Sequence, residues 1–351
     1  MRLRKMLMTM ALGVLSAGTW AGNMATPLKF SPQGKFKIVQ FTDLHLSDKE
    51  SEKNGDNSDQ ARIQRAAKEK IALLRDIVAI LDVEKPNLVI FTGDLVLTPK
   101  DFSQHWKDII KPLSDRNIPW AAVMGNHDKE CTRKTNREII TFLEKLPGSL
   151  TRRGPENIGG GGNYVLIIKS SNSDQTAFAL FCMDSGGYAD KKLCGGYAWF
   201  PDSSIAWFRQ QVELLTKKNN GKAIPSMAFF HIPFPEFDTA AKTGKVIGTK
   251  KENVCCPKVN SGMFVAMLET KSVIGAFVGH DHSNDYLTSL YGICLGYGRK
   301  TGDFHYRDLP SGGARVIELN ENSRSFSTWI RTAELKQEHF AKVPDAFQTK
   351  K

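Results

Sequence analysis

The chain has 351 residues, of which 41% are hydrophobic and 24% are charged, and its formal net charge is +11. This composition excludes a disordered or fibrous chain and is typical of a globular protein with a large core. The basic residues are scattered and form no stripe interleaved with aromatic residues, so we expect no specific nucleic-acid partner. A diffuse positive field favours small anionic substrates, such as phosphorylated molecules.

The N-terminus has the pattern of a secretory signal peptide. Three basic residues within the first five precede a short apolar stretch over residues 6–20, and the small residues Ala21 and Gly22 follow. The alternative is a membrane anchor, but the apolar stretch contains polar residues and is shorter than the roughly 20 residues that a span needs. We expect cleavage after residue 21, which lowers the formal charge to +8. The mature protein would be secreted or periplasmic and have no membrane span.

Six cysteines occur, and none forms a CxxC pair, so a structural zinc ribbon is not expected. An exported protein can form disulfides. Cys182 with Cys194, or either of the adjacent Cys255 and Cys256 with a distant partner, are possible pairs, and the spacing does not decide between them.

The first half of the chain alternates strand and helix patterns. Residues 35–41 are β-rich and predict a strand, whereas residues 63–81 carry apolar side chains at three- and four-residue steps and predict a helix. Residues 88–91 are a continuous apolar run, which is typical of a strand buried on both faces. A second helix is expected around residues 102–111, and the apolar run 119–124 is expected to enter a third strand.

The second half repeats this alternation and then becomes rich in strands. The predicted elements are a helix at 138–146, a strand at 176–184, a helix that Asp202 can cap, a strand at 226–230, a helix at 260–270, and strands at 272–278, 292–295, 314–319 and 325–330. Residues 332–351 are charged and aperiodic, and we expect them to be a frayed tail. No linker divides the chain, so we predict one domain over residues 22–331. Its α/β fold would be a four-layer α/β/β/α sandwich of two mixed sheets with helices outside.

Five of the eight histidines come directly after predicted strands. They are His45, His127, His231, His280 and His282, and Asp43, Asp94 and Asn126 also lie at strand ends. A single histidine is more often an ordinary hydrogen-bonded residue than a ligand. Five at strand ends, together with carboxylates, indicate one site, because α/β proteins bind ligands at the carboxyl ends of their strands.

The residue types in this set indicate a metal site. Imidazole, carboxylate and amide groups without a thiolate suit zinc, manganese or iron. About seven candidate groups are too many for one ion. Two ions that share a carboxylate roughly 3.5–4 Å apart would use them all, and that geometry is typical of phosphoryl hydrolases.

Together these residues resemble the signature of the calcineurin-like metallophosphoesterases. Five blocks follow the family's order and span roughly residues 35–320; they are residues 43–45, 93–94, 125–128, His231 and residues 279–282. The surroundings, especially residues 119–128 and 297–302, are similar to the purple-acid-phosphatase-like branch of that family.

The resemblance implies two metal ions and assigns their ligands. Asp43, His45 and His282 would hold one ion, Asn126, His231 and His280 would hold the other, and Asp94 would bridge both. In true purple acid phosphatases the first block is Asp-x-Gly, and a tyrosine three residues after the bridging aspartate colours the iron. Here those positions are His45 and Leu97. The purple chromophore is therefore not expected, and the cofactor stays open as two divalent or mixed-valence ions of manganese, zinc or iron.

The chemistry of such a site predicts roles for further residues. Two ions would lower the pKa of a water molecule to give hydroxide for in-line attack on phosphorus. We expect His127 to be the general acid, and Asp128 either orients it or caps a turn. Arg299 and Lys300 follow a predicted strand and either reach the substrate phosphate or are solvated. Asp281 is expected to face away from the metals.

The leading hypothesis is a secreted dinuclear phosphoesterase that acts on phosphate monoesters, with phosphodiesters or nucleotides as the near alternative. A catalytically silent metal-binding relative is a rival. Such a relative would usually lack a ligand or His127, and this chain lacks neither. A nuclease would need a clustered basic groove, which the sequence does not show. The loop over residues 185–199 contains Tyr188, Tyr197 and Trp199, which either wall the pocket or pack internally.

Overall fold

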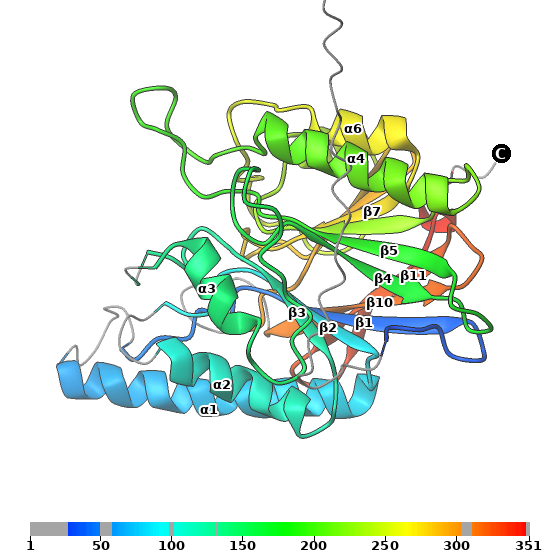
Figure 1. The fold of residues 1–351 in the computed structure, drawn as a ribbon. Coiled ribbons are helices and arrows are strands. Elements are labelled where there is room, and N and C mark those ends of the chain that lie inside the picture. Colours follow the sequence, from blue (N-terminus) through cyan, green and yellow to red (C-terminus); the bar gives the residue numbers. More distant parts are fainter. Residues whose placement is uncertain are drawn as a thin grey trace, which may run out of the picture.

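The computed structural model describes residues 27–49, 58–97, 102–130, 132, 134–302 and 311–348, and the predicted signal peptide lies outside them. Two six-stranded sheets face each other, and helices cover their outer faces (Figure 1). The strand order is β12-β11-β10-β1-β2-β3 in the first sheet and β4-β5-β6-β7-β9-β8 in the second. The predicted four-layer sandwich of two mixed sheets is therefore confirmed.

The bounds of the elements are as follows. The first sheet contains β1 (Lys35–Phe41), β2 (Leu88–Thr92), β3 (Trp120–Val123), β10 (Gly313–Asn320), β11 (Phe326–Thr332) and β12 (Gln337–Val343). The second contains β4 (Tyr164–Lys169), β5 (Thr176–Cys182), β6 (Ser226–Phe229), β7 (Val273–Val278), β8 (Leu287–Leu290) and β9 (Ile293–Tyr297). The helices are α1 (Asp59–Glu84), α2 (Phe102–Ser114), α3 (Asn136–Leu143), α4 (Asp202–Lys218), α5 (Glu236–Thr243), α6 (Met263–Thr270) and the short 3₁₀ helix η1 (Asp345–Phe347).

Strand alternation builds the layers. In β1, Val39 and Phe41 pack toward the helices of the first layer, whereas Ile38 points the other way into the core between the two sheets. Successive side chains of a strand point to opposite faces, so an apolar strand such as β1 fills both layers. Each fully buried aliphatic or phenyl side chain contributes roughly 1.5–3 kcal/mol to stability.

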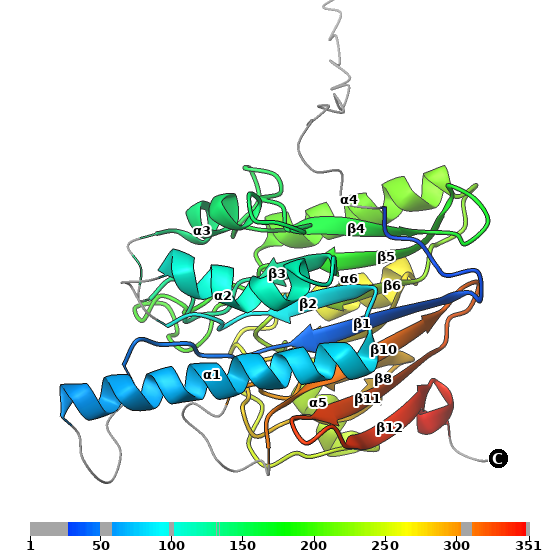
Figure 2. The ribbon, with the colours of Figure 1, turned by 90° about the horizontal axis from the view of Figure 1, so that it is seen from below.

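The parallel strands of each sheet deliver their carboxyl ends to one edge of the sandwich. β1, β2 and β3 are parallel neighbours in the first sheet, and β5, β6 and β7 are parallel neighbours in the second. Figure 2 shows β1, β2 and β3 side by side above the long helix α1. The loops that follow these strands carry the predicted site.

Some expectations about the elements are wrong. The charged segment after residue 332 is not a frayed tail, because β12 pairs antiparallel with β11 and buries Ala341 and Val343. Asp202 does not cap α4, since the N-cap is Pro201 and no side-chain cap bond forms there. Strands β4 and β8 and helix α5 were not predicted.

The described cysteines are free thiols. They are Cys182, Cys194, Cys255, Cys256 and Cys294. Cys182 is fully buried in β5, and the possible pair with Cys194 is not formed. Cys131 lies outside the described residues. No helix in the described ranges combines the length and the apolar character that crossing a membrane requires.

The pairing of β12 predicts different effects for two adjacent substitutions. Val343 is 4% exposed, whereas Lys342 is exposed on the same strand. Val343→Ala should lower the free energy of unfolding by about 2 kcal/mol, because two buried methyl groups are lost and a cavity remains. Lys342→Ala should change it by less than about 0.5 kcal/mol. Urea denaturation measures both values, and equal small effects would contradict the pairing.

Candidate metal centre

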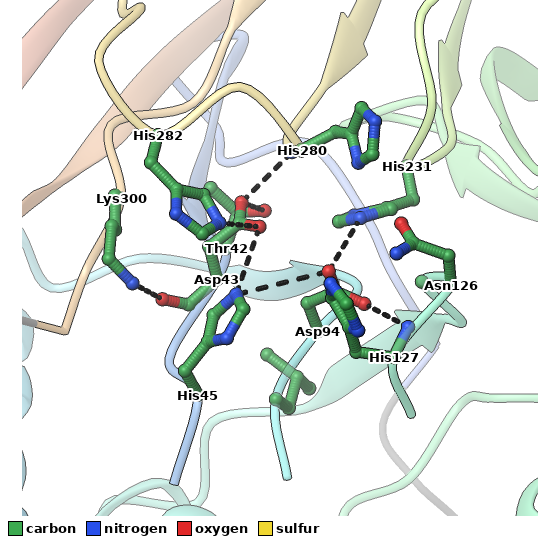
Figure 3. A network of polar contacts seen from close by, with 12 residues as sticks. Thr42, Asp43, His45, Asp94, Asn126, His127, His231, His280, His282 and Lys300 are labelled. Carbon is green, nitrogen blue, oxygen red and sulfur yellow. Dashed lines mark hydrogen bonds and ion pairs between the residues drawn. The ribbon is translucent and has the colours of Figure 1, made fainter. Parts of the chain in front are cut away.

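The predicted metal ligands come together at the carboxyl ends of the strands of both sheets (Figure 3). Asp43 and His45 follow β1, Asp94 follows β2, Asn126 follows β3, His231 follows β6, and His280 and His282 follow β7. Six of them form two groups, in each of which the ligand atoms lie within 4.8 Å of one another; these are Asp43, His45 and His282, and Asp94, His231 and His280. Asn126 is the seventh predicted ligand.

The spacing of the ligand atoms matches two adjacent metal positions. Asp43 Oδ1 lies 3.3 Å from His282 Nε2 and 3.6 Å from His45 Nε2. Asp94 Oδ2 lies 3.0 Å from His231 Nε2 and 3.9 Å from His45 Nε2, so it faces both groups. Nitrogen and oxygen ligands about 2.1 Å from one ion are roughly 3.0–3.6 Å apart at ligand angles of about 90–120°. The carboxylate of Asp94 is therefore placed to be shared.

Buried ligand atoms in this cluster lack hydrogen-bond partners among the described residues. They are Asp43 Oδ1, Asp94 Oδ2, Asn126 Oδ1, His231 Nε2 and His280 Nε2. Buried polar atoms are normally hydrogen-bonded, and a group of exceptions requires an explanation. Lone pairs of oxygen and imidazole nitrogen that face one another are explained by bound cations. The residues therefore fit a pair of divalent ions.

The remaining atoms of the same side chains are held by hydrogen bonds. Asp94 Oδ1 accepts the backbone N–H of His127 at 2.8 Å, and Asp43 Oδ2 accepts the backbone N–H of His280 at 3.1 Å. The Nδ1 atom of His231 lies 2.7 Å from the carbonyl oxygen of Thr92, to which it donates a proton. These bonds leave one oxygen of each carboxylate and Nε2 of His231 directed at the metal positions.

The backbone of the site adopts an unusual conformation. Asp43, His45, Asp94 and His280 have positive φ angles of 53°, 52°, 55° and 77°. Residues other than glycine seldom adopt this left-handed region, and strain of this kind concentrates at functional sites.

Close packing requires a glycine at position 125, directly before Asn126. A Cβ atom on Gly125 would lie 2.0 Å from Asp94 Oδ1. Any side chain at this position would displace the shared carboxylate, so the Gly-Asn-His motif reflects the packing of two strand ends.

The imidazoles of the site differ in charge. Burial lowers the pKa of His231, but the Asp94 carboxylate outweighs burial and raises that pKa to about 10. Burial alone would raise the pKa of Asp94, but the neighbouring His231 outweighs burial and holds that pKa below its usual value. Burial lowers the pKa of His45 and of His280 to about 3. At neutral pH these two rings are therefore neutral. Each has one nitrogen with a lone pair, which is the form that binds a metal ion.

His127 and Asp128 lie where the sequence predicts a loop, but their relation differs from the expectation. The carboxylate of Asp128 accepts backbone N–H groups of Gly125 at 2.7 Å and of Asp94 and Leu95 at 2.9 Å. The prediction that Asp128 orients His127 is wrong, and its alternative role as a turn cap is confirmed.

Glu130 is the carboxylate that contacts His127, and the sequence analysis missed it. Its Oε2 atom forms a very short contact with Nδ1 of His127. The side chain of His127 is 35% exposed, so a substrate can approach it. Its position three residues after His127 is the signal in the sequence that could have identified it.

The two basic candidates for substrate binding are buried. Arg299 is 1% exposed and forms an ion pair with Asp285, so the prediction that it reaches a substrate phosphate is wrong. Lys300 donates from Nζ to the carbonyl oxygen of Asp43 at 2.9 Å, which holds the loop after β1. Contact of Lys300 with a phosphate stays a prediction. Asp281 faces away from the ligands, as expected, and accepts the hydroxyl of Tyr297 at 2.7 Å.

The loop over residues 185–199 borders the ligands on one side. Tyr188 stacks on Tyr197 with ring centroids 5.8 Å apart, and Tyr197 packs edge-on against the ring of His280 at 4.4 Å. The amide of Asn126 donates to the hydroxyl of Tyr188 at 3.0 Å. Both tyrosines therefore contact predicted metal ligands. Trp199 instead lines a separate small hollow with Phe200 and Ile232.

Comparison with known proteins places this site in a family. Residues 36–284 match the family model for calcineurin-like phosphoesterases. Probable inactive purple acid phosphatase 29 of Arabidopsis thaliana is 31% identical over 325 residues, which cover 86% of this chain and 81% of that protein. Phosphatase DCR2 of Saccharomyces cerevisiae is 33% identical over 88% of this chain and 55% of its own length. The chain belongs to the calcineurin-like phosphoesterase family.

A solved structure supports the fold. A dimetal phosphatase from Danio rerio has a TM-score of 0.57 with this chain, at 13% identity, over 88% of this chain and 98% of that one. The relatives named as purple acid phosphatases agree with the branch that the sequence resembles. Leu97 stands where the chromophore tyrosine would be.

Two single substitutions should separate the two metal positions. His282 belongs to the group of Asp43, and His280 belongs to the group of Asp94. Calorimetric titration with Mn²⁺ should give two equivalents for the unaltered chain. His282→Ala and His280→Ala should each weaken a different one by more than about tenfold, because one ligand is lost.

His339→Ala is the control for this titration, since it removes an imidazole on β12 that belongs to neither group. It should retain both equivalents. If His280→Ala and His282→Ala both weakened the same equivalent, the division of the ligands into two positions would be contradicted.

Proposed function

We propose that this protein is a dinuclear metal-dependent phosphoesterase that hydrolyses phosphate monoesters. One observation supports the proposal: two groups of candidate ligands lie side by side, Asp94 Oδ2 faces both of them, and Nδ1 of His127 is hydrogen-bonded to Glu130. A phosphorylated small molecule is the substrate class that suits this site and the basic charge of the chain.

The residues divide the work of such a reaction. A pair of divalent ions in these positions would supply the Lewis acidity that activates water and neutralises phosphate oxygens. The carboxylates of Asp43 and Asp94, held by backbone N–H groups, fix the geometry of the ligands. Glu130 engages Nδ1 of His127, which leaves Nε2 to deliver a proton to the leaving oxygen.

The rival function is metal binding without catalysis. Several relatives carry the word inactive in their names. A silent member of a phosphoesterase family would be expected to lack a ligand or a proton donor, whereas this chain has all seven predicted ligands and His127. This completeness supports the catalytic proposal.

Activity is tested on protein stripped of metal and then supplied with manganese, zinc or iron. We expect hydrolysis of p-nitrophenyl phosphate to exceed that of bis-p-nitrophenyl phosphate, because the proposed substrates are monoesters. Turnover of neither ester with any metal would contradict the proposal, and faster hydrolysis of the diester would move it to phosphodiesters. His127→Ala should retain both metals and lose about 10²–10⁴-fold in rate.

Glu130→Ala supplies a further arm of the same assay. It should lower the rate about tenfold, since the ring of His127 loses its orientation. Glu213→Ala on α4 is the matched control, because the side chain of Glu213 is exposed and pairs with Lys217 on the surface.

We also propose that the protein is exported to the periplasm or the medium. The support is the basic and apolar pattern over residues 1–21. Mass spectrometry of protein recovered from those compartments should find a mature chain that begins at Gly22. Recovery of a chain that retains residues 1–21 in the cytoplasm would contradict export.

A further inference from the structure

The amide of Asn126 has two sides that need different surroundings. Its oxygen Oδ1 is buried and has no hydrogen-bond partner among the described residues, whereas its nitrogen Nδ2 donates to the Tyr188 hydroxyl at 3.0 Å. Only the oxygen can bind a metal ion. An amide turned by 180° would direct its N–H groups at the cation, so the side chain requires a group that fixes its orientation.

Stacking fixes the position of the Tyr188 hydroxyl. A hydroxyl can donate one proton and accept others, so by itself it would tolerate either orientation of the amide. The ring of Tyr188 is held in place by stacking on Tyr197, with ring centroids 5.8 Å apart. Its hydroxyl oxygen accepts from Nδ2 of Asn126 at 3.0 Å, and this bond leaves Oδ1 of Asn126 on the other side of the amide.

We propose that Tyr188 is a positioning residue that orients Asn126 toward one of the two metal ions. The hydroxyl of Tyr188 holds Nδ2 of Asn126, which would turn Oδ1 to the ion held by His231 and His280.

The proposal rests on the proposed dinuclear site and assigns Tyr188 to one ion only. Tyr188 contacts Asn126 and Tyr197 contacts His280, and the proposal assigns both of these residues to the same ion. Loss of the hydroxyl should therefore affect one equivalent of metal and spare the other.

Tyr188→Phe tests the role, because it removes the hydroxyl and keeps the ring that stacks on Tyr197. In a titration with Mn²⁺ alone, the equivalent that His280→Ala weakens should bind about tenfold less tightly, and the other should be unchanged. Tyr291→Phe is the matched control, since Tyr291 is 75% exposed at the turn between β8 and β9. Unchanged affinity of both equivalents in Tyr188→Phe would overturn the proposal.

A second experiment, in the Asn126→Asp variant, separates orientation of the Asn126 side chain from a general effect of Tyr188→Phe on the loop. In Asn126→Asp both side-chain oxygens can bind the ion, so orientation no longer matters. Adding Tyr188→Phe to Asn126→Asp should leave Mn²⁺ affinity unchanged. A further tenfold loss in this background would overturn the proposal, because it would assign the effect to packing. A wild-type chain that binds two ions and hydrolyses no ester would contradict the proposed function alone.

Discussion

The site depends on one constraint: the carboxylates of Asp94 and Asp43 are each held at one oxygen by a backbone N–H group from another loop. Asp94 accepts from His127, and Asp43 accepts from His280, which follows a strand of the opposite sheet. Asp128 holds the same region by accepting three further N–H groups. Leaving one such buried donor unsatisfied costs about 1–3 kcal/mol, so the loops of both sheets are fixed together before any ion binds.

Because these hydrogen bonds join loops of both sheets, the geometry of the site depends on the packing of the whole fold. Two ionised carboxylates and several buried imidazoles are an unfavourable cluster in a protein interior unless cations compensate them. The left-handed backbone at four of the ligand residues adds strain. The two apolar sheets supply the stability that tolerates this cost.

Local pattern was enough to predict much of this arrangement from the sequence. Apolar runs that stop at Asp, Asn or His located the strand ends, and parallel strands bring such ends together. The wrong predictions concern side-chain contacts, which the pattern of apolar and polar residues does not specify. Asp128 follows His127 directly, yet the turn directs its carboxylate at backbone amides and brings Glu130 to the ring. Arg299 is buried because Asp285 lies opposite it, which only the folded chain reveals. β12 was missed because charged residues interrupt its apolar positions at an edge of the sheet.

The central claim is that Asp94 joins two metal positions. Crystals grown with Mn²⁺ and measured by anomalous scattering test it most directly. We predict two peaks about 3.5–4 Å apart, with Oδ2 of Asp94 between them and Asn126 Oδ1 on the side of His231 and His280. A single peak, or two peaks of which only one contacts Asp94, would contradict the account.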